Sequence, residues 1–276
     1  MATKPIRPCD KARRTLRLLG MVTILIAGLS DFAAAQPSQD LYSVQTIVTG
    51  TGEPNRVIGF RYCLDQVIVK VSGDQSLLSD PKMTKLRDHA GDFIDSFRYR
   101  DRLEGIPVHD EQGTHDRPHD LTCIYKPTTI DAVLAEIGRR PWMDERPNLA
   151  IILSVTDQNR SFQLTSDGTE SPYMAESLEA AAVPMALAVA LPATRQLSDL
   201  QKGTLKVDEI VRKLGADLPL TGKLIWSRKD LGWVAEWQLA FHGQTYEWQE
   251  RGVSFDEAFR SAIRGAAQIL SGNGRP

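Results

Sequence analysis

The strongest constraint on the fold is a strict alternation of side chains near the carboxyl end of the chain. From Trp233 to Phe241, apolar side chains that include two tryptophans occupy every second residue, and this period of two is typical of a strand with one buried face. The His242-Gly243 pair that follows has the composition of a tight turn. The neighbouring patterns extend this strand into a predicted three-strand meander over 220–226, 233–241 and 245–248.

A helix is predicted to follow the meander and to cover it. Ser254 and Glu257 form a capping box, in which each side chain bonds the other residue's backbone N–H. The apolar stripe of this helix consists of Phe255, Ala258, Phe259, Ala262, Ile263, Ala266 and Leu270. Because such a stripe must be buried, the end of the chain indicates a helix packed on a sheet.

The first half of the chain has shorter elements of both types. Its patterns predict a strand over 42–48, helices over 54–72 and 83–97, strands over 97–100 and 121–125, and a helix over 127–138. The polar residues between the two later strands are expected to form a long loop.

Residues 149–155 are continuously apolar, as in a strand that is covered on both faces. We expect a polar loop over 157–171, then a helix over 174–181 and a buried strand over 185–191. A strand, a helix and a second buried strand in this order predict a parallel βαβ unit. Another helix is expected over 207–214.

The domain organisation follows from a break in these patterns. Prolines 141 and 147 interrupt regular structure on either side of Trp142. We therefore predict a signal peptide over 1–35, an N-terminal α+β domain over 41–138, a linker over 139–147 and a C-terminal α/β-type domain over 148–272. The predicted fold class is α+β, with two small domains of helices packed on mixed β-sheets, the second of which ends in the meander and the terminal helix.

The first 35 residues have the order of a secretory signal. Six basic residues precede the apolar run Leu18–Leu29, and the small residues Ala33-Ala34-Ala35 follow it. The apolar run is much shorter than the roughly 20 residues of a membrane span, so we expect a cleaved leader and no membrane span after cleavage. The predicted compartment is the periplasm.

The charge balance disfavours nucleic acid as a partner. Residues 1–35 hold six of the 33 basic and two of the 35 acidic side chains, so 27 basic and 33 acidic side chains remain, with a net charge of −6. A mildly acidic surface repels phosphates, and no dense Lys/Arg stripe is present in the sequence. With 42% apolar residues, the chain can build a core.

Two cysteines remain after the leader, since Cys9 precedes the apolar run. Cys63 and Cys123 are an even pair in an oxidising compartment, which favours a disulfide. The alternative is a pair of buried free thiols that act as small apolar groups. The sequence leaves both interpretations open.

One cluster could bind a metal ion. His109, His115 and His119 are each followed by an aspartate, and imidazole with carboxylate can ligate zinc or copper. The alternative is a solvated loop, and Pro118 discourages the helical turn that would bring two of these histidines together. The loop offers a second hypothesis for function, a metal-binding protein or metal-dependent enzyme.

Four of the five tryptophans fall in the predicted meander, at 226, 233, 237 and 248. If exposed, they would form a platform for stacking sugars or binding protein. If the terminal helix covers that face, they are core residues. We favour the second interpretation for Trp233 and Trp237, and leave Trp226 and Trp248 open.

Several short motifs occur in a recognisable order. They are Val67–Asp74, Phe97-Arg98-Tyr99, Pro141-Trp142 ahead of Arg146-Pro147, and a Trp-rich meander with an Ala-rich terminal helix. This order resembles domain-of-unknown-function family 2066, which consists of exported proteins of Gram-negative bacteria. The resemblance implies a compartment and an architecture, and it implies no catalytic residues or cofactor.

These observations predict an exported, non-catalytic binding or assembly module of the cell envelope whose partner is another envelope protein. The sequence contains no G-x-S-x-G, H-E-x-x-H, P-loop or G-x-G-x-x-G motif. We therefore assign no catalytic residue and no cofactor from the sequence.

Overall fold

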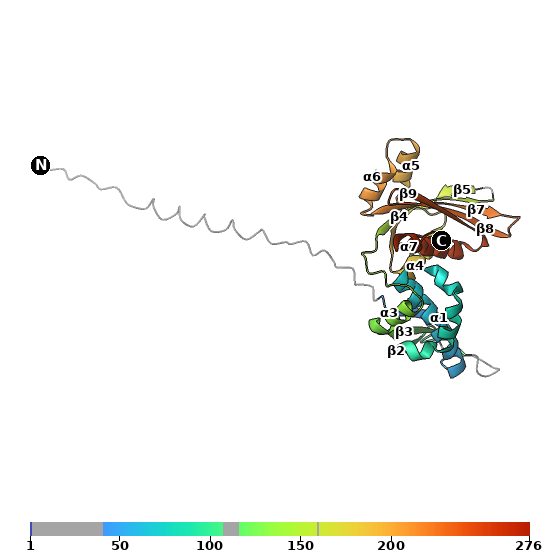
Figure 1. Cartoon of the computed structure of the whole chain (residues 1–276). Coiled ribbons are helices and arrows are strands. Elements are labelled where there is room, and N and C mark those ends of the chain that lie inside the picture. The colour runs from blue at the N-terminus through green and yellow to red at the C-terminus, as the bar shows by residue number, and fades with distance from the viewer. Residues whose placement is uncertain (2–40, 107–115, 159) are drawn as a thin grey trace. The chain divides into compact units, whose positions relative to one another are not determined.

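The computed structural model describes residue 1 and residues 41–106, 116–158 and 160–276. The predicted signal peptide therefore lies outside the described residues, apart from Met1. From residue 40 onward the chain forms one compact unit that contains two β-sheets (Figure 1).

The first sheet has three antiparallel strands in the order β1-β3-β2. Its elements are β1 Ser43–Thr49, α1 Glu53–Ser72, η1 Gln75–Ser79, α2 Pro81–Asp88, η2 Ala90–Phe93, β2 Ile94–Asp101, β3 Pro118–Tyr125 and α3 Pro127–Glu136. The long helix α1 has a favourable proline, Pro54, in its first turn, and it ends where Gly73 adopts a left-handed conformation. Its buried stripe, which includes Leu64, Val67 and Ile68, packs on the sheet and forms the first core.

The second sheet has the order β5-β4-β7-β8-β9, with β6 beside β4. Its elements are β4 Asn148–Asp157, β5 Arg160–Gln163, α4 Pro172–Ala182, η3 Val183–Met185, β6 Ala188–Ala190, α5 Thr194–Gln201, α6 Val207–Lys213, β7 Leu218–Ser227, β8 Gly232–Phe241, β9 Gln244–Val253 and α7 Phe255–Leu270. β4 pairs in parallel with β6 and β7, and the other pairs are antiparallel. The sheet is therefore mixed.

Two helices cover one face of the second sheet. In Figure 1, α4 and α7 lie on one side of the strands, and α5 and α6 lie on the other. The second core lies under α7, where the ring of Phe259 contacts the edge of Trp237 at 6.4 Å between centroids. Gly265 permits the close approach of β9, because a Cβ atom there would lie 2.7 Å from the Trp248 ring.

A joint connects the two sheets at the carboxyl end of α1. The last four carbonyl groups of this helix all accept hydrogen bonds, which offsets the usual loss of partners at a helix end. The pairs are Gly73 N to Val69 O (2.8 Å), Arg146 Nη2 to Lys70 O (2.7 Å), Trp142 N to Val71 O (2.7 Å) and Asn273 Nδ2 to Ser72 O (2.9 Å). Three of the four donors come from beyond residue 138, so this end of α1 depends on the second half of the chain.

The α+β fold class is confirmed, as are the meander, the terminal helix and the parallel βαβ arrangement. Half of the predicted capping box is present, since Ser254 Oγ accepts from Glu257 N, whereas the Glu257 carboxylate binds Arg260 and Arg264. Within the described ranges, no helix has the length and hydropathy of a membrane span. The division into domains at 139–147 stays a prediction. Within that segment Trp142 is buried, at 5% exposure, whereas Arg140, Met143, Asp144 and Glu145 are exposed.

Several predicted boundaries are wrong. The helix expected over 83–97 ends at Asp88, because from Ile94 the chain pairs with β3. The strand expected over 185–191 is reduced to β6. The loop predicted over 157–171 contains β5, and α5 was not anticipated at all.

Candidate functional site

The second sheet carries a groove of about 730 Å³. It lies on the face of the second sheet that α4 and α7 leave uncovered. Side chains alternate across a strand, so the residues that face the groove are those between the core residues of each strand. Two rows of side chains cross the strands and form its floor.

The first row contains one residue from each of five neighbouring strands. The register places Gln163, Ser154, Lys223, Glu236 and Gln249 side by side, in that order from β5 to β9. Gln249 Nε2 donates to Glu236 Oε1 at 3.3 Å. The row therefore offers a hydroxyl, amides, an ammonium and a carboxylate.

The second row lies next to the first and begins with an apolar residue. Ile152, Thr221, Gln238 and Glu247 are aligned on β4, β7, β8 and β9. Thr221 Oγ1 donates to Gln238 Oε1 at 3.4 Å, and Gln238 Nε2 donates to Glu247 Oε1 at 3.0 Å. These cross-strand bonds orient the polar side chains of the floor.

One wall of the groove is the short helix α5. Its residues Leu197 and Leu200 pack with Ile152 in a small apolar cluster that also contains Ile210 of α6. Leu197, Leu200 and Gln201 line the groove. The β4 end of the groove is thus apolar, and the β8–β9 end is polar.

The position of α5 is set at its first residue. Asp167 Oδ1 accepts hydrogen bonds from both the backbone N–H and the hydroxyl of Thr194, each at 2.8 Å. These bonds lower the pKa of Asp167 below that of an ordinary aspartate, because they favour the charged carboxylate. A carboxylate at the start of a helix also interacts favourably with the helix dipole.

The groove offers several groups that can form hydrogen bonds and ion pairs with a ligand. Its polar groups are solvent-facing hydrogen-bond donors and acceptors of mixed charge, arranged in two parallel rows. The one hydroxyl in its first row, on Ser154, lies 3.5 Å from the carbonyl oxygen of Gly222 in a hydrogen bond. The hydroxyl of Ser154 is thus engaged with the backbone, and Lys223 is its neighbour on β7 in the register.

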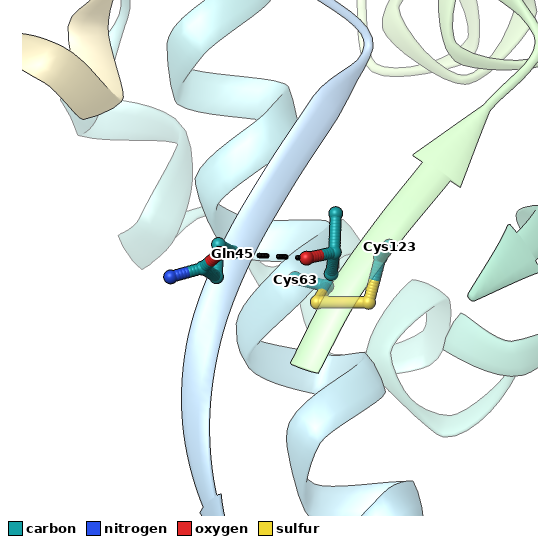
Figure 2. The surroundings of a disulfide bond; sticks show 4 residues. Gln45, Cys63 and Cys123 are labelled. Carbon is teal, nitrogen blue, oxygen red and sulfur yellow. Dashed lines mark hydrogen bonds between the residues drawn. A yellow bond between two sulfur atoms is a disulfide. The ribbon is translucent and has the colours of Figure 1, made fainter. Parts of the chain in front are cut away.

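Cys63 and Cys123 are joined in the structure. A disulfide connects Cys63 of α1 with Cys123 of β3, with 6.2 Å between the Cα atoms (Figure 2). Both cysteines are fully buried. Figure 2 also shows Gln45 of the neighbouring strand β1, whose side chain accepts a hydrogen bond from Thr122 at 3.4 Å. The disulfide links the main helix, α1, to β3, the central strand of the first sheet.

The predicted histidine cluster is only partly described. His109 and His115 lie outside the described residues. His119 belongs to β3 and not to the predicted loop, and its Nδ1 atom is 2.8 Å from Arg117 O. Among the described residues, no group of three histidine, cysteine, aspartate or glutamate side chains is arranged to hold a metal ion.

The aspartate beside His119 has another role. Asp120 is buried, and its carboxylate binds the guanidinium groups of Arg100, at 2.5 Å, and Arg102, at 3.5 Å. The metal hypothesis for His109, His115 and His119 stays a prediction, because two of these three residues lie outside the described ranges.

The tryptophans of the meander face the core side of the sheet. Trp233 and Trp237 are 7% and 2% exposed, so the interpretation as core residues is confirmed for these two. Trp226 packs edge-on against Trp233 at 5.4 Å between ring centroids and is half-buried, as is Trp248. The groove floor is therefore built from the polar residues between the tryptophans.

The comparisons with known proteins concern the other half of the chain. Residues 35–143 match the model of a domain of unknown function (DUF8605). The comparison with curated proteins gives no match. The matched segment covers less than half of the chain and contains the first sheet, whereas every residue that lines the groove lies after it.

This match corrects the expected resemblance to domain-of-unknown-function family 2066, which is wrong. The motifs behind that expectation have structural roles in this fold. Residues 67–73 are the buried end of α1 with its left-handed glycine, and Trp142 and Arg146 form the joint. Residues that hydrogen-bond the last carbonyl groups of a helix can occur in unrelated families. Such motifs therefore do not identify a protein family.

Proposed function

We propose that this protein is exported to the periplasm and acts there as a non-catalytic binding module of the cell envelope. In this proposal, the groove of the second sheet binds an extended segment of another envelope protein. The observation that carries the proposal is the pair of cross-strand rows, which present hydrogen-bonding side chains across five strands beside an apolar wall.

The size of the groove suits an extended polypeptide. Neighbouring strands lie about 4.8 Å apart, so the first row, from β5 to β9, spans roughly 19 Å. An extended chain advances about 3.3 Å per residue, so about six residues can lie along this row. Amides, hydroxyls and carboxylates in the floor can bond both the backbone and the side chains of such a segment.

Two features support export. The leader has the order of a cleavable signal, and a disulfide between buried cysteines is favoured in an oxidising compartment. Fractionation of cells that express the full chain tests this part of the proposal. We expect the shortened, mature protein in the periplasmic fraction, and an uncleaved protein in the cytosol would contradict export.

The binding role is tested by photo-crosslinking in living Gram-negative cells. A photoreactive phenylalanine analogue replaces Thr221 in the groove floor, or Tyr173 of α4 as the control. Tyr173 is 74% exposed and belongs to a helix that covers the opposite face of the sheet. We expect a discrete crosslink to an envelope protein from position 221 and none from position 173. Equal crosslinks from both positions, or none from 221, would overturn the binding role.

A further inference from the structure

The groove has carboxylates at its β8–β9 end and apolar side chains at its β4 end. This arrangement favours some extended polypeptide segments over others. Glu236 of β8 and Glu247 of β9 each accept one amide hydrogen bond through Oε1. The second oxygen of each carboxylate makes no hydrogen bond or ion pair with the described residues. Two carboxylates are thus available to a ligand at the β8–β9 end.

Lys223, the cation that lines the groove, forms no close ion pair with these carboxylates in the described structure. Lys223 is opposite Glu236 in the register, yet no ion pair of 4.0 Å or less joins them in the described structure. Two carboxylates and one ammonium leave the groove with a net negative charge. A cationic side chain of a ligand is therefore favoured near Glu236 and Glu247.

The β4 end of the groove favours an apolar side chain of the ligand. Ile152 and Leu200 are only partly buried, and both line the groove next to Leu197. An apolar side chain that covers these residues removes their surface from water and gains free energy in proportion to the area buried. The strand order places β4, which carries Ile152, two strands from β8 and three from β9.

We propose that the ligand is a polypeptide segment with an apolar residue followed or preceded, three to four positions away, by lysine or arginine. The apolar end and the carboxylates lie two to three strands apart, which is about 10–14 Å. An extended chain advances about 3.3 Å per residue, so three to four residues cover this distance. The apolar residue contacts Ile152, Leu197 and Leu200, and the cation pairs with Glu236 and Glu247. This inference rests on the proposed function, because it specifies the ligand of the same groove.

The test uses the mature, disulfide-bonded protein and a random twelve-residue peptide library displayed on phage. Selected peptides are then synthesised, labelled with fluorescein and titrated at low salt. We expect the enriched sequences to share the apolar and basic pair at the stated spacing. Enrichment of acidic peptides, enrichment without this pair, or the absence of any enriched peptide would overturn the inference.

Charge-reversed variants locate the binding. Glu236→Lys with Glu247→Lys is compared with Glu176→Lys with Glu179→Lys, a pair of exposed positions on α4 with the same change in net charge. We expect the first pair to weaken binding of the selected peptides about 10-fold, because two attractions become repulsions, and the second pair to leave it unchanged. Equal effects of the two variants would indicate an effect of net charge alone and would overturn the assignment of the cation.

The outcomes separate this inference from the proposed function. If position 221 crosslinks an envelope protein and the yield is unchanged in the Glu236→Lys/Glu247→Lys variant, the groove binds a partner and our assignment of its chemistry is wrong. If position 221 gives no crosslink, the proposed function itself fails. Tighter binding of chitohexaose than of any selected peptide would instead indicate a glycan site, and would overturn the inference.

Discussion

The two sheets of this protein are stabilised in different ways. The first has three strands, and a disulfide joins its central strand to its main helix. The second has six strands and no cysteine in its sequence, and a larger apolar cluster under α4 and α7 stabilises it. A small sheet buries little apolar surface, so a covalent link adds stability that a larger core supplies by burial alone.

The titratable groups of the two halves also differ. In the first half, burial raises the pKa values of Tyr42, Tyr125 and Asp65, because a low-dielectric environment disfavours their charged forms. In the second half, hydrogen bonds lower the pKa values of Asp167 and Asp230. The two halves should therefore respond in opposite directions to a change of pH.

The largest expected effect is in the second core. Replacing Phe259 by alanine removes a fully buried ring that contacts Trp237, and we expect a loss of about 3–5 kcal/mol in the free energy of unfolding. Urea denaturation followed by tryptophan fluorescence measures this, since all five tryptophans lie at or beyond residue 142. The control is Phe255→Ala, which truncates a half-buried ring and should cost less than half as much. Equal losses would show that α7 is not packed as described.

Removing the disulfide should have the next largest effect, on the first sheet. The double variant Cys63→Ala with Cys123→Ala opens a loop with a sequence separation of 60 residues, and we expect a loss of about 2–4 kcal/mol. Far-UV circular dichroism during urea denaturation measures it. A loss well under 1 kcal/mol would mean that burial alone stabilises the first sheet and that the contrast between the sheets is wrong.

The joint determines whether the two sheets unfold together. Arg146 donates to Lys70 O and Met185 O and lies 4.3 Å from the Trp142 ring centroid, and its burial lowers its pKa to about 10. For Arg146→Met we expect a loss of about 2 kcal/mol, because two buried carbonyls lose their donor while the cost of burying the charge is relieved.

The informative measurement is the agreement between two probes. In the wild-type protein, tryptophan fluorescence and circular dichroism should report the same urea midpoint. In Arg146→Met the two midpoints should separate, since the first sheet then unfolds without the second. Arg140→Met, at an exposed position in the same segment, is the matched control. Coincident midpoints in both variants would contradict a coupling role for Arg146.

Alkaline pH should weaken the first half. Burial and the hydrogen bond to Asp131 raise the pKa of Tyr42 to about 12, above its ordinary value of 10.0. A raised folded pKa contributes stability that is fully present below about pH 10 and is lost as the pH rises through about 12. The difference in unfolding free energy between wild type and Tyr42→Phe should therefore shrink over this range. A difference that is constant with pH would exclude a contribution from this tyrosine.

The predictable part of the fold depends on contacts between residues close in sequence. The meander was predicted because its period of two is visible within one strand, and the cap of α7 because Ser254 and Glu257 are three residues apart. The end of α2 was missed because the apolar stripe continues through Ala90 and Phe93. What ends this helix is pairing of Ile94 with Tyr125, which a local pattern does not contain.

The groove was missed for the same physical reason. Lys223, Glu236 and Gln249 become neighbours only through the register of three strands, and separately they read as ordinary surface residues. The wall helix α5 has eight residues, which is short for a helical pattern to be recognised. Its pair of leucines, Leu197 and Leu200, was the available signal, since their spacing places both on one face.

The smallest expected effect concerns the attachment of this wall. Asp167 has a lowered pKa, so its contribution is present above the pKa of an ordinary aspartate, roughly 4, and is lost as the pH falls through its lower folded value. Asp167→Asn should reduce this acid sensitivity and weaken the binding of a selected peptide at neutral pH by a few-fold, because α5 loses a charged acceptor at its start. Asp157→Asn, at the end of β4, is the control. If both variants bind alike, the position of α5 does not depend on this carboxylate.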